Sequence, residues 1–582
     1  MKKILTFILS AVLLLSVIPF NTFTANAETE TGKFENFTYK ISYGTITITG
    51  YEYDGSEPAE VIIPSEIAGY PVTTIYYLDI VLNKNIKSIY IPKSVTMISM
   101  SGYLVDPHYI SLESIEVEPE NPIYHSSGNC IIQTAEKQLI FGSNKSIIPS
   151  DGSVVYIYYF AFYGCNSLES ITIPDSVVNI GYYAFDGCSS LKNITIPNAV
   201  VSIGYNAFYN CSSLESITIP DSVVNIGEHA FEGCSSLESI TIPKSVVSIG
   251  SSAFDGCSSL ESIIIPNGVT SIGDSAFGGC SSLESITIPD SVVNIGDYAF
   301  SGCSSLESIT IPDSVVNIGE RAFGGCSSLE SITIPDSVVN IGDYAFSSCN
   351  SLESITIPDS VVNIGDYTFC QCGLLKSLKI PESTVSIGEH AFEDCSSLET
   401  ITIPDGVVSI GDSAFYNCSS LESINIPDGV VSIGDSAFSC CSSLESISLP
   451  DSITTIGIDA FFGCSLLESI TIPDSVVSIG RAAFQYCGLK NITIPDGIIK
   501  ISDYTFCQCG LLKSLKIPES TVSIGEHAFE GCSSLETITI PDSVVSIGSY
   551  AFQYCGLKNI TISDSVVSIG DSAFTVAIYS KA

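Results

Sequence analysis

A 23-residue unit repeats through most of this 582-residue chain and limits what the chain can fold into. One copy runs from Leu306 to Ser328, and eighteen such copies follow one another from Gly164 to the C-terminus. A period of this length is typical of a solenoid, in which each repeat forms one coil and buries its apolar side only against its neighbours. The sequence therefore predicts a long array rather than one compact active-site domain, and we expect the function to reside on an extended surface.

Prolines show how strictly the repeat keeps its phase. They recur every 23 residues from Pro174 to Pro473 and from Pro495 to Pro541. The step shortens to 22 at two junctions, from Pro473 to Pro495 around Cys487 and from Pro541 to Ser563, which replaces the proline, around Cys555. A one-residue deletion inside a strand would exchange its buried and exposed faces. We therefore place both deletions in loops.

The copy that starts at Leu168 shows how one coil is expected to form. Leu168, Ile171 and Ile173 are spaced so that they point inward from a short strand, which Pro174 ends because it cannot donate to a sheet ladder. Stacked coils then form a parallel sheet with about 4.8 Å between strands, or about 85 Å over eighteen coils. The other predicted interior residues are Val177, Ile180, Ala184, Phe185 and Cys188, with Gly181 at a turn.

The full pattern, Leu-x-x-Ile-x-Ile-Pro-x-x-Val-x-x-Ile-Gly-x-x-Ala-Phe-x-x-Cys, resembles the BspA-like branch of the leucine-rich repeat superfamily over nearly the whole mature chain. This resemblance implies a mainly-β solenoid that forms a right-handed arc, with a parallel sheet on one face and short strands and turns on the other. It also implies a secreted or surface protein of bacteria that binds host matrix components or other cells. The family supplies no catalytic residues.

Residues 1–27 have the features of a secretory signal. Lys2 and Lys3 precede an apolar run over residues 4–20, and the segment ends in Ala25-Asn26-Ala27, a small-residue cleavage site. An uncleaved anchor is the alternative, but the Ala-x-Ala ending favours cleavage. No other segment is long and apolar enough to cross a bilayer, so we predict a secreted or bacterial cell-surface protein without membrane insertion after cleavage.

The rest of the chain divides into three parts. We expect an N-terminal β-hairpin cap over residues 28–58, irregular leucine-rich repeats over 59–152, and the regular array over 153–582. Residues 118–124 and 128–141 predict a second hairpin inserted in the irregular part, and the chain holds no other copy of it. This segment either caps the array or carries a unique function, and capping is the favoured interpretation.

Charge excludes two classes of partner. The chain has 63 acidic and 21 basic residues and a formal net charge of −42, whereas nucleic acids and anionic lipids require basic patches. Only 14% of residues are charged and 45% are hydrophobic, which argues against disorder.

The 22 cysteines suggest disulfides in an exported protein, but eighteen of them form one column at Phe-x-x-Cys. Neighbouring Cβ atoms in a strand ladder lie about 4.8 Å apart, whereas a disulfide requires about 3.8 Å, so free buried thiols are predicted. Metal binding at Cys370–Cys372 or Cys507–Cys509 is disfavoured because neither His nor a second Cys pair stands at zinc-site spacing. The off-column cysteines are Cys130, Cys370, Cys440 and Cys507.

Polar residues recur at the outward positions of the predicted strands and form the candidate binding face. Serine and threonine repeat there, and aspartate repeats just after the proline that ends each strand. Tyr298, Tyr344, Tyr367 and Tyr504 are expected to add contact area on the side away from the sheet. Carboxylates stacked about 5 Å apart would also suit Ca²⁺, but the array lacks the Asp-x-Asp-x-Asp pattern of dedicated sites, so solvated charge is the simpler interpretation. The nine candidate residues are Ser285, Thr287, Ser308, Thr310, Ser331, Thr333, Asp290, Asp313 and Asp336.

No pattern in the sequence indicates an enzyme. The five histidines lack metal-ligand spacing, three of them lie in Gly-Glu-His-Ala-Phe variants of the repeat, and no Ser/His/Asp set stands out. We therefore predict no catalytic residue, no metal and no cofactor.

These observations favour a secreted or cell-surface adhesion protein that binds an extracellular protein or glycan through many weak, repeated contacts. The alternative is a structural spacer without a ligand of its own. A Ca²⁺-dependent array and an ice-binding array are further alternatives. The ice-binding array is disfavoured because half of the hydroxyls belong to serine and leucine-rich repeat sheets curve.

Overall fold

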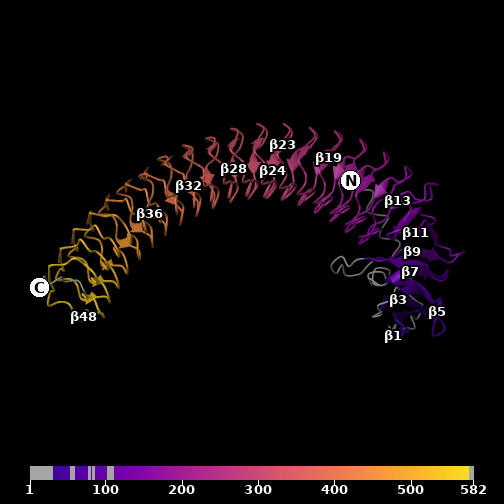
Figure 1. The fold of residues 1–582 in the computed structure, drawn as a ribbon, viewed down its shortest axis with the longest axis horizontal. Coiled ribbons are helices and arrows are strands. Elements are labelled where there is room, and N and C mark those ends of the chain that lie inside the picture. The colour runs from indigo at the N-terminus through magenta and orange to yellow at the C-terminus, as the bar shows by residue number, and fades with distance from the viewer. Residues whose placement is uncertain (1–29, 53–58, 77–79, 81–85, 101–109, 576–582) are drawn as a thin grey trace, which may run out of the picture.

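The computed structural model describes residues 30–52, 59–76, 80, 86–100 and 110–575. The repeats are successive coils of an arched solenoid (Figure 1). Residues 110–575 form strands, turns and bends without a helix. The predicted mainly-β solenoid of stacked parallel strands is confirmed. The predicted signal peptide and His108 lie outside the described residues.

One strand per coil comes from the Ser-Ile-Thr segment, and we call the succession of these strands the first strand stack. Its strands run parallel and in register, as in the pairing of Ile286 with Ile309. The two outer residues of each strand are exposed, and the central residue points inward and is buried, except that Ile560 in the last coil is only half-buried. The strands are β15 (Asn193–Thr195), β17 (Ser216–Thr218), β19 (Ser239–Thr241), β21 (Ser262–Ile264), β23 (Ser285–Thr287), β25 (Ser308–Thr310), β27 (Ser331–Thr333), β29 (Ser354–Thr356), β31 (Ser377–Lys379), β33 (Thr400–Thr402), β35 (Ser423–Asn425), β37 (Ser446–Ser448), β39 (Ser469–Thr471), β41 (Asn491–Thr493), β43 (Ser514–Lys516), β45 (Thr537–Thr539) and β47 (Asn559–Thr561).

A second, shorter strand follows the proline of each coil, and these strands form the second strand stack. The sequence predicted short strands or turns here, and the structure shows parallel pairing from coil to coil, for example Ile295 with Ile318. The strands are β13 (Tyr156–Ile157), β14 (Asn179–Ile180), β16 (Ser202–Ile203), β18 (Asn225–Ile226), β20 (Ser248–Ile249), β22 (Ser271–Ile272), β24 (Asn294–Ile295), β26 (Asn317–Ile318), β28 (Asn340–Ile341), β30 (Asn363–Ile364), β32 (Ser386–Ile387), β34 (Ser409–Ile410), β36 (Ser432–Ile433), β38 (Thr455–Ile456), β40 (Ser478–Ile479), β42 (Lys500–Ile501), β44 (Ser523–Ile524), β46 (Ser546–Ile547) and β48 (Ser568–Ile569).

The Ala-Phe turn forms a third line of contact between coils. The backbone N–H of Phe323 donates to the carbonyl of Ala345 at 2.9 Å, and that of Arg321 donates to Asp343 at 2.9 Å. Arg321 itself has φ of 51°, a left-handed conformation that L-residues adopt at a cost. The three segments of a coil are thus all bonded to adjacent coils, and the bonds offset this strain.

The interior repeats the same residues in every coil. Rings of Phe300, Phe323 and Phe346 stack with centroids 5.4 and 5.5 Å apart. Gly181 begins the predicted turn, since the N–H of Ala184 donates to its carbonyl at 3.3 Å. A Cβ there would lie 2.7 Å from the backbone N of Tyr159, so the close approach of the neighbouring coil also requires glycine. All eight interior residues predicted for the copy at Leu168 are buried: Leu168, Ile171, Ile173, Val177, Ile180, Ala184, Phe185 and Cys188.

The described N-terminal residues form a meander of three antiparallel strands rather than only a hairpin. The predicted hairpin forms around Tyr43 and Gly44, whose φ values of 51° and 78° match the turns that join twisted strands. The strand β1 before it was not predicted. The elements of this region are β1 (Glu30–Phe34), β2 (Phe37–Ser42), β3 (Thr45–Tyr51), β4 (Ala59–Ile62), β5 (Glu66–Ile67), β6 (Tyr70–Tyr76), β7 (Ile86–Ile91), β8 (Met97–Ser99) and β9 (Ser114–Val117).

The inserted hairpin is built into the core. Strands β10 (Tyr124–Ser127), β11 (Cys130–Gln133) and β12 (Gln138–Phe141) pair antiparallel, and β12 then pairs parallel with β13 at the start of the second strand stack. Ile131 packs in the N-terminal core, whereas Ile132 and Leu139 pack in the core of the array. Residues 128–141 therefore contribute to both cores, and replacing them with a short turn would open both.

Deleting one coil tests whether the array is modular. Removal of residues 283–305 joins Ser282 to Leu306 in register, so we expect a folded protein whose β-type circular dichroism falls in proportion to its length. Its melting temperature should stay close to that of the parent, because stability is a sum of local and nearest-neighbour terms. A matched deletion of residues 283–294 breaks the register and should unfold the array locally. Global unfolding after the 23-residue deletion would contradict the modular interpretation.

Candidate functional site

The six predicted hydroxyl residues stand side by side on the first strand stack. Ser285 pairs with Ser308 and Thr287 with Thr310, and Ser308 in turn pairs with Ser331. All of them are exposed, as is Thr333 at the end of β27. The structure therefore brings these residues together into two parallel rows, one of serine and one mainly of threonine.

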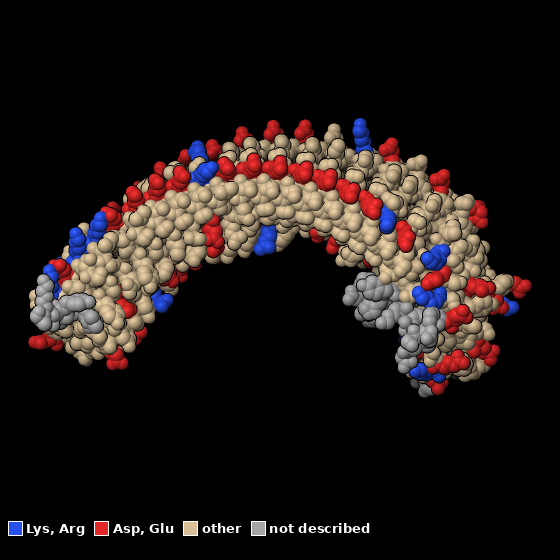
Figure 2. Space-filling model, in the orientation of Figure 1, with Lys and Arg blue, Asp and Glu red and all other residues tan. Residues whose placement is uncertain are grey.

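Acidic residues flank the hydroxyl rows. Asp290, Asp313 and Asp336 are exposed just after the prolines of their coils, and an exposed glutamate such as Glu307 precedes each of β23, β25 and β27. Figure 2 shows acidic side chains in rows that follow the arc. Two carboxylates about 5 Å apart in water repel each other by about 0.8 kcal/mol without salt. Because these carboxylates are exposed, dissolved ions screen the repulsion and the fold tolerates it.

A third acidic row, which sequence reasoning missed, has a structural role. The Asp297 carboxylate accepts a hydrogen bond at 2.8 Å from the backbone N–H of Glu320 in the next coil, and Asp343 accepts one at 2.9 Å from Asp366. Asp435 accepts the N–H of Ile458 in the same way. These carboxylates bind adjacent coils together and are therefore less available to a ligand. Their recurrence directly after Ile-Gly was the signal in the sequence.

Three of the predicted tyrosines, Tyr298, Tyr344 and Tyr367, lie in one column of stacked side chains, and Tyr504 stacks on His527 in a separate one. The ring centroids of Tyr344 and Tyr367 lie 4.4 Å apart, and His390 continues the stack at 4.3 Å from Tyr367. The guanidinium of Arg321 lies 4.3 Å from the Tyr344 centroid, on the side toward Tyr298. Because the rings cover one another's faces, they offer mainly edges to solvent, which is less contact area than the sequence suggested.

Three histidines pair with a glutamate three residues later. His390 Nδ1 lies 2.7 Å from Glu393 Oε2, and His527 Nδ1 lies 2.6 Å from Glu530 Oε2. His229 forms the equivalent pair with Glu232. In the part of the chain that the structure describes, no three His, Cys, Asp or Glu side chains are grouped as a metal site requires.

The cysteine column is a ladder of buried thiols. All 22 cysteines are free, and on the column each Sγ from Cys188 to Cys555 lies within hydrogen-bonding distance of a phenylalanine carbonyl in the preceding coil, as Cys326 does to Phe300 at 3.3 Å. Burial raises the pKa of the Cys303 thiol to about 12. Off the column, Cys370 and Cys507 are also buried, with Sγ 3.9 Å from Glu393 and 4.0 Å from Glu530.

Asp186 is a buried carboxylate that sequence reasoning also missed. It is 5% exposed, and its Oδ1 has no hydrogen-bond partner among the described residues. Burial raises the pKa of Asp186 to about 7. Burial, and then the charge of Glu232, raise the pKa of Asp255 to about 6. Glycine, serine and other polar residues stand at this position in most coils, so no pattern in the sequence marked Asp186.

The comparisons with known proteins agree on the repeat. A family model described as "BspA type Leucine rich repeat region (6 copies)" matches residues 155–284, 247–374, 362–488 and 460–579. A leucine-rich repeat protein from Bacteroides ovatus ATCC 8483 is 37% identical over 58% of this chain and 84% of its own, with a TM-score of 0.48. One from Eubacterium ventriosum ATCC 27560 is 26% identical over 48% of this chain and 85% of its own, with a TM-score of 0.37.

A leucine rich cell surface protein from Faecalibacterium prausnitzii A2-165 is 24% identical over 93% of this chain and 95% of its own, with a TM-score of 0.20. The comparison with curated proteins found no match. Among the described residues, no helix has the length and apolar character to span a membrane.

Thiol reactivity tests the cysteine ladder. In the native protein, we expect a thiol reagent to modify few cysteines, because burial covers them and raises their pKa values. After unfolding without a reductant, most of the 22 should react. A titre below about a quarter of them would show that disulfides staple the coils.

The substitution Asp186→Asn tests the buried carboxylate. The pKa of Asp186 is higher in the folded chain than in the unfolded chain, so its favourable contribution is complete at low pH and is lost as pH rises from about 4 to about 7. Asp186→Asn should therefore raise the unfolding midpoint at pH 8, by the equivalent of roughly 1–4 kcal/mol, and change it little at pH 4. The control Asp290→Asn replaces an exposed carboxylate and should change the unfolding midpoint little, as surface substitutions usually do. Equal effects of Asp186→Asn at both pH values would refute this account.

Proposed function

The chain belongs to the BspA-type leucine-rich repeat family, and from this premise we propose that it is a non-enzymatic binding protein that is secreted or displayed on the bacterial surface. Its first strand stack engages an extracellular protein or glycan. The similar cell surface protein from F. prausnitzii supports the location, and the absence of a spanning helix among the described residues is compatible with it.

One observation carries the proposal: the same exposed hydroxyl and carboxylate groups recur on neighbouring strands in strict register. Ser308 and Thr310 pair with Ser285 and Thr287 of β23, and Asp313 follows three residues after Thr310. A ligand that contacts one coil therefore meets an equivalent group on the next coil. Linked weak contacts of this kind multiply into useful affinity.

The chemistry of the face sets the kind of contact. Hydroxyls both donate and accept hydrogen bonds, and the carboxylates accept them, so the face suits polar groups of a protein or the hydroxyls of a sugar. Trp is absent from the chain and the tyrosine faces are covered by stacking, so a flat aromatic platform for sugar rings is not part of the proposal. Binding is therefore weak per coil and distributed over many coils.

Arrays of glycans and extracellular-matrix proteins, probed with residues 28–582, test the function directly. Binding of a neutral glycan or a matrix protein supports the proposal. A folded protein that binds nothing on either array would favour a structural spacer instead.

Removing the threonine hydroxyls tests which face binds. The variant Thr287→Val, Thr310→Val and Thr333→Val keeps side-chain size, and Ile264 already stands in this row at 74% exposure, so the fold accepts an apolar residue there. Three lost hydrogen bonds should weaken binding of an array ligand roughly tenfold or more.

Serines of the second strand stack provide the matched control. Ser248→Ala, Ser271→Ala and Ser409→Ala remove three exposed hydroxyls from that stack and should leave binding within about twofold, the range expected of surface changes away from the site. If this control loses binding as much as the threonine variant does, the first strand stack is not the binding face.

A further inference from the structure

Lysines replace the usual residues at a few positions of the first strand stack. In residues 193–561, the row of threonines that ends each strand contains a lysine only at Lys379 and Lys516. Lysines also replace the glutamate that precedes the strand, and two of these replacements, Lys490 and Lys513, occur in consecutive coils. Lys490 and Lys513 thus stand just before β41 and β43, and Lys516 ends β43, in a chain whose net charge is −42.

The hydrogen bonds of the backbone place these lysines next to one another. The N–H of Lys513 donates to the carbonyl of Lys490 at 3.2 Å, and Asn491 pairs with Ser514 in the strand ladder. Lys516 lies two residues further along β43, on the same outward face as Ser514. The three lysines therefore border one patch of the face.

Lys513 and Lys516 can still bind an anion, because the neighbouring glutamates form ion pairs with other lysines. Glu468 on one side binds Lys490 at 2.5 Å, and Glu536 on the other side binds Lys558 at 2.6 Å. None of the ion pairs in the described part of the chain involves Lys513 or Lys516. The acidic row after the proline continues here with Asp496 and Glu519, so the positive patch is narrow.

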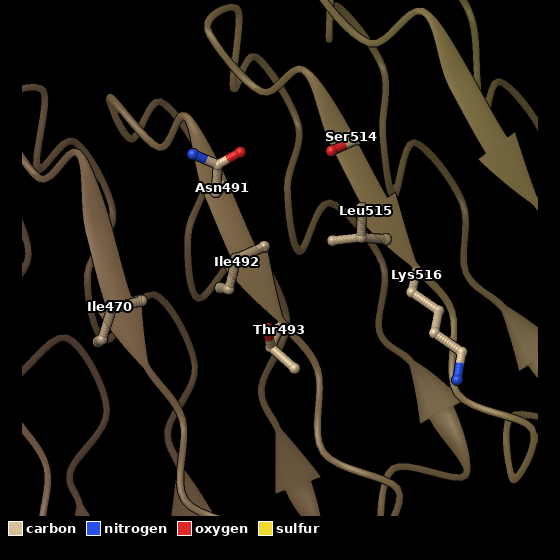
Figure 3. Close-up of a pocket in the computed structure, with 7 residues that line it drawn as sticks. All are labelled: Ile470, Asn491, Ile492, Thr493, Ser514, Leu515 and Lys516. Atoms are coloured by element: carbon tan, nitrogen blue, oxygen red, sulfur yellow. The ribbon is translucent and has the colours of Figure 1, made fainter.

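A shallow hollow lies over the same strands (Figure 3). The polar residues in its lining are Asn491, Thr493, Ser514 and Lys516. The amide and the hydroxyls can donate and accept hydrogen bonds, and the ammonium group donates to an anion. This combination matches a ligand that carries both hydroxyls and a negative charge.

The chain contains an internal comparison. Residues 366–393 and 503–530 are identical, so β31 and β43 carry the same outward side chains. In the first copy the preceding coil supplies Glu353, which binds Lys376 at 3.2 Å, whereas in the second copy it supplies Lys490. Two strands of identical sequence thus have different neighbours: β31 lies beside the coil with Glu353, and β43 lies beside the coil with Lys490.

We propose that the hollow over β41 and β43 binds an acidic glycan. Lys516 binds one carboxylate or sulfate group of the glycan, and Lys513, which stands just outside the hollow and three residues earlier, binds a second such group. Asn491, Thr493 and Ser514 bind neighbouring sugar hydroxyls. The proposal rests on the proposed function and names the ligand class for one part of the same face. Nucleic acid is disfavoured, because its many phosphates would meet the acidic rows on either side of so narrow a patch.

Binding of short oligosaccharides to residues 28–582, measured by calorimetry at two salt concentrations, tests the proposal. The probes are a galacturonate tetrasaccharide, a sulfated tetrasaccharide, a neutral glucose tetrasaccharide and a tetraglutamate peptide. We expect the acidic sugars to bind more tightly than the neutral sugar and the peptide, and added salt to weaken their binding. The carboxylated and sulfated probes distinguish the two sources of the anion.

The decisive variant is Lys513→Glu with Lys516→Thr, which restores the residues that most other coils carry and so keeps the fold. It should weaken binding of the acidic sugars by roughly fivefold to thirtyfold, as expected for the loss of two exposed ion pairs. The matched control, Lys376→Glu with Lys379→Thr, makes the same change in the first copy and should leave binding within about twofold.

Three results would overturn the proposal: equal losses in the two variants, no loss in either, or binding of tetraglutamate as tight as that of the galacturonate probe. If none of the acidic sugars binds while a ligand from the arrays does, this inference fails and the proposed function stands. If no ligand of any class binds, both fail.

Discussion

Strict 23-residue register is the constraint on which the rest of this structure depends. One coil has too few residues to enclose a core, so its isoleucines, phenylalanine and cysteine are buried only because the next coil places the same residues beside them. Hydrogen bonds between coils in both strand stacks and at the Ala-Phe turn hold this register. The stacked rings of Phe300, Phe323 and Phe346 show its regularity in the interior.

The register that aligns identical residues in the core also aligns identical residues on the surface. Identical outward residues fall beside one another, so carboxylates repel their neighbours, and the chain tolerates this where water screens them. Lys376, Lys490 and Lys558 interrupt the glutamate row and bind the adjacent glutamates. In return, a ligand meets the same hydroxyls coil after coil, which gives distributed weak binding its physical basis.

The periodic part of the structure could be predicted from the sequence, because one coil explains all others. The interior residues of the copy at Leu168 and the outward rows through Ser308 and Thr310 lie where the pattern placed them. The sequence also predicted that the cysteines remain free thiols, which the structure shows.

What could not be predicted depends on contacts between coils or on single substitutions. The stacking of Tyr344 on Tyr367 and the backbone bond accepted by Asp297 require the distance between coils, which no propensity supplies. Aspartate is usually exposed, and Asp186 is buried only because of the residues that pack around it. The patch at Lys513 and Lys516 arises because a duplicated segment lies beside a different coil, and a search for common patterns overlooks such an exception.

The distance between two first-stack positions tests the register most directly. Ser285 and Ser423 lie six repeats apart, so spin labels introduced there by non-canonical amino acids should lie about 29 Å apart, at about 4.8 Å for each coil. Moving the second label from Ser423 to Ser446 should add about 5 Å. Electron–electron double resonance measures both distances. A separation that does not increase by one strand spacing per 23 residues would contradict the account.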